Sequence, residues 1–327
     1  MDEKNLTTRS TWHQGDQSGK GQKICVAAAQ YPISFFTAEA EFYAKTEEWV
    51  RKAASSGARY LLFPEYGAME LTSLLTREQR ADLKSQARNM AKFLKAFLDH
   101  FSFMARKYNC HIIAPSFPVY QTEQLTTNRV YIFSAGGTVE YQDKLFMTRF
   151  EDEDWGVQSG PREIKIFITE KLIFSVATCF DVEFAFPALA AAQNGAQLLF
   201  VPSCTETIRG ANRVHVGARA RALENQMYVV VSQTVGAAPW SEAVDENNGF
   251  AAVYATPDTG FPEDGVINAG GWNTEQWLLT EIDLSLIEKV RTEGKVFNFG
   301  THKKLFDSEP AAHSLMNSWP VKKIRLI

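Results

Sequence analysis

The chain has 327 residues, 45% of them hydrophobic, a length that suits one large domain or two small ones around a sizeable core. Its 34 Lys and Arg against 38 Asp and Glu leave a net charge of −4, which argues against a general nucleic-acid binder, and the 23 Phe argue against intrinsic disorder. Four Cys without a CxxC pair argue against a disulfide scaffold and a zinc knuckle, so we expect reduced thiols in a cytoplasmic protein.

The N-terminal segment is polar throughout. Residues 1–22 lack the apolar stretch of a targeting signal, so we expect a polar N-terminal arm there. No later run approaches the length of a membrane-spanning helix, and we therefore expect no membrane partner.

Short apolar runs then alternate with charged, periodic segments. Apolar runs beside turn residues predict buried strands, and apolar residues that recur every third or fourth position predict helices. In chain order we expect strand 24–29, helix 37–55, strand 60–63, helix 80–108, strand 111–114, a hairpin of 130–134 and 139–144 around Gly136 and Gly137, strand 172–178, helix 183–194, strand 198–201, helix 214–226, strands 228–232, 251–254 and 277–283, and a last helix from 284 to 291.

Strand–helix units mix with a hairpin in this order, which predicts an α/β domain with mixed rather than purely parallel sheets. There is no linker-like stretch between residues 23 and 300 and no internal repeat, so we expect one domain over 23–300. The remainder, 301–327, ends in the basic run PVKKIRLI, and we expect a C-terminal tail that makes oligomer contacts.

Three segments at expected strand ends carry reactive side chains: FPEY at 63–66, YQDK at 141–144 and ATCFD at 177–181. Sites in α/β folds gather where strands end, so the Glu, Lys and Cys of these segments could meet. A carboxylate can take the proton of a thiol, the thiolate can attack a carbonyl or nitrile carbon, and an ammonium can stabilise the oxyanion. The combination therefore indicates acyl-transfer chemistry.

Each residue alone has a plainer interpretation. Cys179 could be a small buried side chain, Glu65 a first-turn helix carboxylate and Lys144 a solvated hairpin residue. On composition alone, any of the four thiols could be the nucleophile. The functional interpretation rests on the three residues together.

The sequence around these residues resembles the three blocks of the nitrilase superfamily, the carbon–nitrogen hydrolases. The blocks here are FPEYGAMEL at 63–71, YQDKLFMTRFEDEDWGVQSG at 141–160 and ATCFDVEFAFP at 177–187, in the order and spacing of the family. Supporting segments extend the resemblance over roughly residues 23–295; they are AAAQ at 27–30, NGAQLLFVPS at 194–203, ARARALENQMYVVVSQTVG at 218–236 and LLTEIDLSLIEKVR at 278–291.

The resemblance implies a four-layer αββα sandwich with a Cys–Glu–Lys triad. Cys179 would be the nucleophile, Glu65 the general base, and Lys144 with the backbone N–H of Phe180 the oxyanion hole. The resemblance implies no metal and no organic cofactor.

The family also uses a second active-site Glu downstream of the Lys. In the acidic run 151–154, Glu153 has the better spacing to Trp155, and Glu151 is the alternative. A solvated loop is the plainer interpretation of most of this run, and a calcium loop would need a Gly and an Asx alternation that the run lacks. Tyr66 and Trp155 lie close enough to the motifs to shape a pocket.

One departure from the family pattern follows the nucleophile. The run FAFP at 184–187 displaces the Pro and lacks the acid that members commonly carry there. That loop would lie beside the substrate, so the departure concerns specificity more than chemistry.

Other candidates are tied less closely to the motifs. Cys204 follows a strand that should run beside the strand of Cys179, and it could line the pocket. His215 could line the pocket or lie on the surface of its helix. Cys25 and Cys110 stand in strand-like contexts and are expected in the core.

We therefore predict hydrolysis of a small-molecule amide or N-carbamoyl amine through a thioester on Cys179. Nitrile hydrolysis by the same triad and a non-catalytic binding module on the same fold are the alternatives. The resemblance implies a homodimer or larger homo-oligomer. Loops 117–127, 204–213 and 236–250 are expected to shape the pocket and so to determine the substrate specificity.

Overall fold

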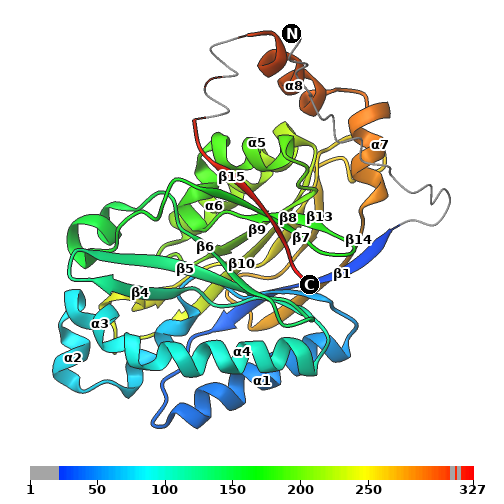
Figure 1. Ribbon diagram of the computed structural model, residues 1–327. Coiled ribbons are helices and arrows are strands. Elements are labelled where there is room, and N and C mark those ends of the chain that lie inside the picture. The colour runs from blue at the N-terminus through cyan, green and yellow to red at the C-terminus, as the bar shows by residue number, and fades with distance from the viewer. Residues whose placement is uncertain (1–21, 310–313, 315–317) are drawn as a thin grey trace, which may run out of the picture.

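The computed structural model describes residues 22–309, 314 and 318–327. Strands fill its middle, and two groups of helices cover them from opposite sides (Figure 1). One group contains α1 (Glu39–Ser55) and α4 (Leu94–Lys107). The other contains α5 (Ala185–Gln193) and α6 (Ile208–Asn225). Apart from Gln22, the arm expected at 1–22 lies outside the described residues.

The described strands form one hydrogen-bonded network in the order β15-β7-β8-β9-β10-β1-β2-β3-β5-β4, with β6 on β5, β14 on β1, β11 and β12 on β10, and β13 on β12. The strands are β1 (Lys23–Pro32), β2 (Tyr60–Leu62), β3 (His111–Ile113), β4 (Phe117–Thr122), β5 (Leu125–Phe133), β6 (Val139–Asp143), β7 (Ile164–Ile168), β8 (Ile173–Val176), β9 (Leu198–Ser203), β10 (Tyr228–Ala237), β11 (Glu246–Asn247), β12 (Ala252–Tyr254), β13 (Val266–Ala269), β14 (Gln276–Asp283) and β15 (Val321–Arg325).

The sheet is mixed, as the sequence predicts. Strand β1 runs parallel to β2 and β10, and β8, β9 and β10 are parallel neighbours. The pairs β1–β14, β4–β5 and β5–β6 are antiparallel. Parallel pairs joined through helices and antiparallel pairs joined by hairpins thus occur in one sheet.

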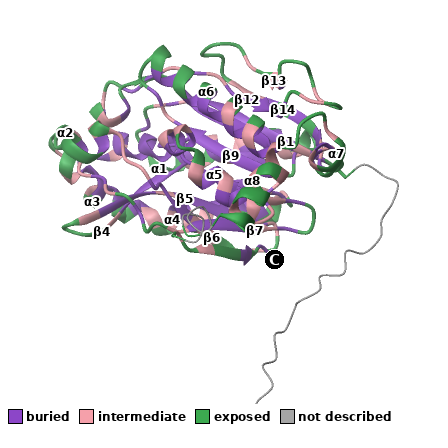
Figure 2. Ribbon diagram, turned by 90° about the horizontal axis from the view of Figure 1, so that it is seen from above, coloured by how far each residue is buried: buried purple, intermediate pink, exposed green. Residues whose placement is uncertain are grey.

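Three apolar layers divide the molecule, and β1 shows how they arise. Side chains of a strand alternate between its faces, so Ala27 and Ala29 pack toward α1 and α4 while Val26 and Ala28 face the opposite side. That opposite side is a layer between the two halves of the sheet, where Val26 shares a cluster with Phe174 of β8. A third layer lies under α5 and α6. Helix, sheet, sheet and helix therefore make the expected αββα sandwich, with buried strands between more exposed helices (Figure 2).

Local sequence signals explain where the main helices begin. Helix α6 begins after Thr207, whose hydroxyl accepts a hydrogen bond from Gly210 N at 3.1 Å. Before α1, the Glu41 carboxylate accepts from Thr37 N at 2.7 Å and from Ala38 N at 3.2 Å. The remaining α-helices are α2 (Arg77–Ala81), α3 (Gln86–Met90), α7 (Ser285–Glu293) and α8 (Asn298–Ser308).

The prediction of a single long helix over 80–108 is wrong. Helix α2 ends at Ala81, and α4 begins only at Leu94. Asp82 accepts a hydrogen bond from Ser85 N at 3.3 Å, and the buried side chain of Gln86 donates to Arg80 O at 2.7 Å. These side-chain bonds compete with helical backbone bonds and end the helix early.

Two segments for which the sequence predicted no strand belong to the sheet. Residues 117–122 form β4 and pair with β5 in a hairpin, where we expected a pocket loop. The expected tail contributes β15, which runs parallel to β7 with Ile324 opposite Phe167. Within the described chain, no helix has the length and apolarity needed to cross a membrane.

Candidate active site

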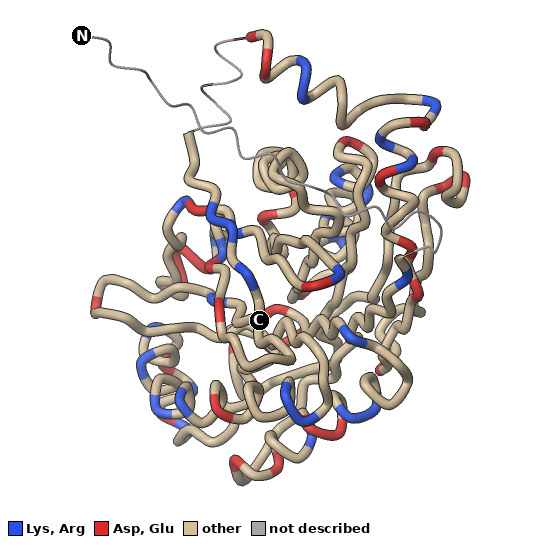
Figure 3. The backbone as a smooth tube through the Cα atoms, turned by 45° about the vertical axis from the view of Figure 1, so that its right-hand side comes forward, with Lys and Arg blue, Asp and Glu red and all other residues tan. Residues whose placement is uncertain are grey.

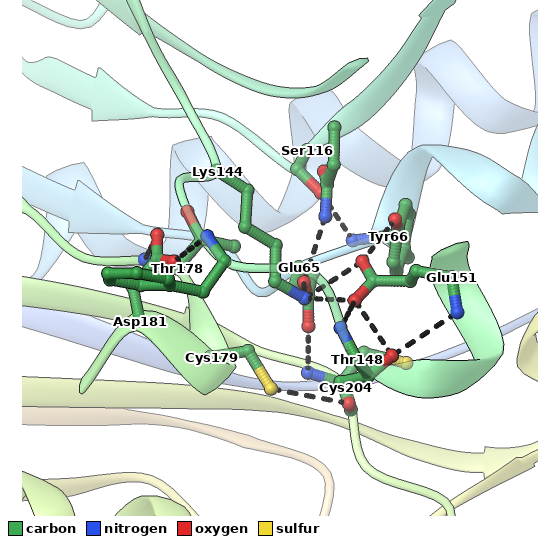
Figure 4. Close-up of polar contacts among 12 residues, drawn as sticks. Glu65, Tyr66, Ser116, Lys144, Thr148, Glu151, Thr178, Cys179, Asp181 and Cys204 are labelled. Atoms are coloured by element: carbon green, nitrogen blue, oxygen red, sulfur yellow. Dashed lines mark hydrogen bonds and ion pairs between the residues drawn. The ribbon is translucent and has the colours of Figure 1, made fainter. Parts of the chain in front are cut away.

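The three motif residues stand just beyond the ends of three strands. Glu65 follows β2, Lys144 follows β6 and Cys179 follows β8. Figure 4 shows their side chains turned toward one point, with Cys204, which follows β9, on the same side. The structure therefore brings together the residues that the sequence motifs single out, while their catalytic roles stay a prediction.

Lys144 lies between two carboxylates. Its Nζ is 2.9 Å from Glu65 Oε1, and 2.8 and 2.6 Å from the two oxygens of Glu151. The side chains of Lys144 and Glu65 are each 1% exposed, so these ion pairs are shielded from water. Charges in such a place attract strongly, but they persist only when their hydrogen-bonding capacity is used.

The surroundings of both carboxylates meet that condition. Glu65 Oε1 also accepts from Asn128 Nδ2 at 2.8 Å, and its Oε2 accepts from Cys204 N at 3.0 Å. Glu151 accepts from Tyr66 OH at 2.7 Å and from both the N–H and the hydroxyl of Thr148 at 2.9 Å. Each carboxylate is thus fixed in orientation around the ammonium.

The two carboxylates differ in their affinity for a proton. Burial raises the pKa of Glu65 above its usual value, and the charge of Lys144 offsets this only in part. Burial also acts on Glu151, but Lys144 and the donors of Thr148 and Tyr66 hold the pKa of Glu151 below its usual value. Glu65 is therefore the carboxylate that can receive a proton, while Glu151 stays ionised.

Lys144 itself stays charged. Burial on its own would lower the pKa of this ammonium, but Glu151 and Glu65 raise it well above its usual value. A permanently charged donor at this position suits the stabilisation of an anion rather than proton transfer.

Cys179 occupies a constrained turn. Its φ is +48°, in the left-handed region, at the start of the 3₁₀ segment η5 (Cys179–Glu183). The Asp181 carboxylate accepts from Thr178 N at 3.1 Å and from Phe146 N at 2.8 Å, which ties this turn to the segment that follows Lys144. The thiol lies 3.7 Å from the carbonyl oxygen of Cys204.

The resting thiol is neutral. Burial, followed by the negative charge of Glu65, raises the pKa of Cys179 well above its usual value. A nucleophilic thiolate therefore requires a base at hand, and Glu65 is a carboxylate beside Cys179 whose pKa is raised.

A cavity of about 360 Å³ opens onto these residues. That volume lies in the range of small-molecule sites. Phe180 lines it beside Cys179 at the start of η5, where backbone N–H groups lack partners within their own helix. The cavity walls include Glu65, Tyr66, Lys144, Thr148, Arg149, Phe150, Glu151, Trp155, Cys179, Phe180, Glu183, Cys204, Thr205, Glu206, Thr207, Gly210, Arg213, Val214 and the segment 242–246.

The sequence model of the carbon–nitrogen hydrolase family matches residues 25–292 of this chain. The chain belongs to this family. The Probable hydrolase YhcX of Bacillus subtilis is 32% identical over 274 residues, 84% of this chain and 52% of that protein, so the chain spans about half the length of this relative. Omega-amidase NIT2 of Danio rerio is 24% identical over 280 residues, 83% of this chain and 92% of its own. The crystal structure of Saccharomyces cerevisiae Nit3, a nitrilase-superfamily member, covers 83% of this chain and 93% of its own, with 20% identity and a TM-score of 0.64.

In this carbon–nitrogen hydrolase, the structure places Glu151, the alternative for the second acid, against Lys144, and not Glu153. Glu153 is exposed and pairs with Arg149 at 2.7 Å, whereas Glu151 is buried against Lys144. Residues Phe150–Trp155 form a short π-helix, in which Glu151 and Trp155 are buried and the acids between them are exposed. The wider turn of a π-helix places side chains differently from the spacing that favoured Glu153.

The aromatic candidates lie at the cavity as expected. Tyr66 is buried with φ +54°, and its ring centroid is 4.8 Å from that of Trp155. Burial and the charge of Glu151 raise the pKa of Tyr66 well above its usual value, so its hydroxyl remains a donor to that carboxylate. Both rings line the cavity.

The two remaining candidates, Cys204 and His215, differ in their position relative to the cavity. Cys204 lines the cavity, and its Sγ lies 3.1 Å from Asn247 Oδ1. His215 does not line it: the ring is buried, stacked on Phe250 at 3.8 Å, with Nδ1 2.9 Å from Tyr254 OH. Burial lowers the pKa of His215 to about 4, so it is a neutral structural group.

Several residues whose hydrogen bonds orient the groups of the site were not identified from the sequence. Asn128 lies on β5 between Thr127 and Arg129, where no sequence signal distinguishes it. Thr148 and Asp181 fall within the quoted motif blocks but carried no assigned role. Of the expected pocket loops, parts of 204–213 and 236–250 line the cavity, and 117–127 does not.

No group of three His, Cys, Asp or Glu side chains within the described residues is arranged to hold a metal ion. The ammonium of Lys144 occupies the space between the two buried carboxylates.

Proposed function

We propose that the protein hydrolyses a small amide or N-carbamoyl amine through a thioester on Cys179. The observation that carries the proposal is Lys144 held between Glu65 and Glu151 next to a buried thiol at the base of a cavity. Membership of the carbon–nitrogen hydrolase family and the amidase names of several relatives support an amide rather than a nitrile.

The first half of the reaction forms the thioester. Glu65 accepts the proton of Cys179 as the sulfur attacks the amide carbon, and the carbonyl oxygen becomes an oxyanion. Lys144 and the backbone N–H of Phe180 stabilise that oxyanion. Glu65 then gives its proton to the departing nitrogen, the C–N bond breaks, and ammonia or an amine leaves.

The second half releases the acid. Glu65 takes a proton from water, the hydroxide adds to the thioester carbon, and the C–S bond breaks. The sulfur recovers its proton from Glu65, so water is the sole co-reactant and the enzyme returns to its starting state. Glu151 stays ionised throughout and keeps Lys144 in place.

The test is a screen of amides, N-carbamoyl amines and nitriles with detection of released ammonia, run on the wild type and on Cys179→Ala. We expect one class to be hydrolysed by the wild type and an acyl adduct on Cys179 to be trapped by mass spectrometry. The matched control is Cys204→Ala, which removes the other cavity thiol. Turnover by Cys179→Ala at the wild-type rate would show that the nucleophile is misassigned.

The alternative of a binding module is tested by thiol reactivity. The described structure contains four unpaired cysteines, which is also why we propose a cytoplasmic location. If the site is catalytic, substrate should slow iodoacetamide labelling of Cys179, and Cys179 should be labelled faster than the buried Cys110. Equal, slow labelling of all four thiols together with no turnover would favour a binding role.

We also propose that the protein forms a homodimer or larger oligomer through the face of α6. Val216 is 69% exposed and Ile208 is 58% exposed on that helix, next to the turn that carries Cys179. Large exposed apolar side chains gathered on one helix favour an interface between copies of the chain. A light-scattering mass corresponding to a single chain would contradict this proposal.

A further inference from the structure

The cavity is lined by more carboxylates than its chemistry requires. Besides Glu65, Glu151 and Lys144, five acids and two arginines line it. Along the backbone drawn in Figure 3, positively and negatively charged residues are interspersed. The acids are Glu183, Glu206, Glu242, Asp245 and Glu246, and the arginines are Arg149 and Arg213.

Both arginines already have partners. Arg213 lies 3.3 Å from Glu183, and Arg149 lies 2.7 Å from Glu153. The other four acids are exposed at the cavity, and none of them forms an ion pair within the described chain. We call these four, Glu206, Glu242, Asp245 and Glu246, the acidic wall.

The acidic wall belongs to one side of the cavity, because two segments that carry it are bound to each other. Asn248 donates through its side chain to Glu206 O at 2.7 Å and through its N–H to Thr205 O at 2.8 Å. Thr205 returns a hydrogen bond from its hydroxyl to Asn248 O at 2.7 Å. The same loop supplies the Cys204 N–H that binds Glu65, so the wall continues directly from the triad.

Within the described residues, no group of His, Cys, Asp or Glu, the acidic wall included, is arranged to hold a metal ion. The carboxylates of the acidic wall suit a cation whose charge lies at the end of a carbon chain. Apolar side chains of Phe150, Trp155 and Val214 line the same cavity and can contact methylene groups. Unpaired charge of one sign at a cleft also raises the local concentration of oppositely charged substrate.

One residue of the cavity lining carries a buried hydrogen-bond donor without a partner in the described chain. Trp155 is 3% exposed and lines the cavity, and its Nε1–H has no hydrogen-bond partner within the described chain. Buried donors of this kind are normally satisfied, and an oxygen of a bound substrate would satisfy this one.

We propose that the substrate is an amide or N-carbamoyl amine whose other end carries an ammonium group on an alkyl chain. The inference rests on the proposed function, because it places the scissile group at Cys179 and the ammonium at the acidic wall. The chain of the substrate then lies along the apolar part of the cavity.

The experiment compares three amides of the same chain length and different charge: γ-aminobutyramide, which is cationic, butyramide, which is neutral, and succinamate, which is anionic. Two quantities are measured for each, kcat/KM for ammonia release and protection of Cys179 from iodoacetamide. We expect γ-aminobutyramide to exceed butyramide by about tenfold or more in both, succinamate to be the poorest, and the differences to shrink as salt is added.

Variants test whether the acidic wall causes the preference for the cationic amide. In Glu242→Gln/Glu246→Gln, we expect the advantage of γ-aminobutyramide over butyramide to fall severalfold. The matched control is Glu170→Gln, which removes an exposed carboxylate between β7 and β8, away from the cavity, and should keep the advantage.

Equal values for the three amides, a preference for succinamate, or an equal loss of preference in the Glu170→Gln control would overturn the inference. Failure of the proposed function looks different. In that case no amide, carbamoyl amine or nitrile releases ammonia, while the order of protection at Cys179 still shows whether the cavity selects a cation.

Discussion

Among the described residues, two clusters of nearly the same composition differ in their surroundings: one faces the cavity, and the other lies between α1 and the end of β1. Each consists of a lysine, a glutamate and a tyrosine whose hydroxyl donates to the glutamate, at 2.7 Å in one cluster and 2.8 Å in the other. The site cluster is Lys144, Glu151 and Tyr66, and the scaffold cluster is Lys45, Glu70 and Tyr31.

The clusters differ in what else the lysine contacts. In the scaffold cluster, Lys45 pairs with Glu70 and also donates to Pro32 O and, at 2.8 Å, to the Ser34 hydroxyl. Ser34 N donates to Glu70 at 2.7 Å, so the cluster is closed on itself and joins α1 to the end of β1. In the site cluster, Lys144 meets a second carboxylate, Glu65, beside a thiol and a cavity. A buried ion pair therefore does not by itself mark an active site.

The largest contrast should come from neutralising one carboxylate beside each lysine. Glu65→Gln removes the proposed base, and we expect kcat to fall by about 10³-fold with the fold retained. Glu70→Gln leaves Lys45 without its carboxylate, and we expect the free energy of unfolding to fall by about 3 kcal/mol while kcat of the folded enzyme is unchanged. Steady-state kinetics and urea unfolding of both variants measure this. Loss of kcat in folded Glu70→Gln would break the distinction between the clusters.

A smaller contrast lies within one acidic run. Glu151→Gln should loosen Lys144 and lower kcat by about 10²-fold with little change in KM, because Lys144 would be misplaced at the oxyanion. Glu153→Gln alters only an exposed pair with Arg149 and should behave like the wild type. If the KM rose and kcat stayed the same in Glu151→Gln, Glu151 would bind substrate rather than position Lys144.

The smallest effect concerns a buried titratable group outside both clusters. His215 has a pKa near 4 in the folded protein because of burial, against about 6.5 when unfolded. As the pH falls, the unfolded chain takes up the proton first, so stability is lost between about pH 6.5 and pH 4, and about 2 kcal/mol of it by pH 5. His215→Phe should therefore lose less stability than the wild type between about pH 7 and pH 5.

Unfolding free energies at the two pH values measure this difference. The control is His302→Gln, since His302 lies on α8 and is not buried. An equal loss of stability in wild type and His215→Phe would mean that His215 does not titrate as described.

Much of the fold could be predicted because its periodicity is local. The alternation of Ala27 and Ala29 with Val26 and Ala28 determines which face of β1 meets the helices, and the structure confirms the mixed sheets and four layers. The break near Asp82 could not be predicted from periodicity, since it depends on side-chain hydrogen bonds that compete with the helix.

The candidate site was predictable to the extent that motif residues stand at strand ends. Glu65, Lys144 and Cys179 fall into that class, and the structure brings them together. The choice between Glu151 and Glu153 depended on a π-helical turn, which sequence spacing does not reveal. The hydrogen bond from Cys204 N to Glu65 joins residues far apart in the chain and needed the folded sheet to appear.

The left-handed backbone at Tyr66 and Cys179 has a consequence for attempts to make this protein more robust. Each φ, +54° and +48°, holds a side chain in a conformation that costs an L-residue about 1–2 kcal/mol. At Cys179, whose side chain is small, a library selected only for heat resistance is therefore expected to enrich glycine, which adopts this conformation without strain. At Tyr66 the loss of the ring packed on Trp155 and of the hydrogen bond to Glu151 would outweigh the relieved strain. Thermal selection would thus work against activity at Cys179, so any such library requires a parallel activity screen.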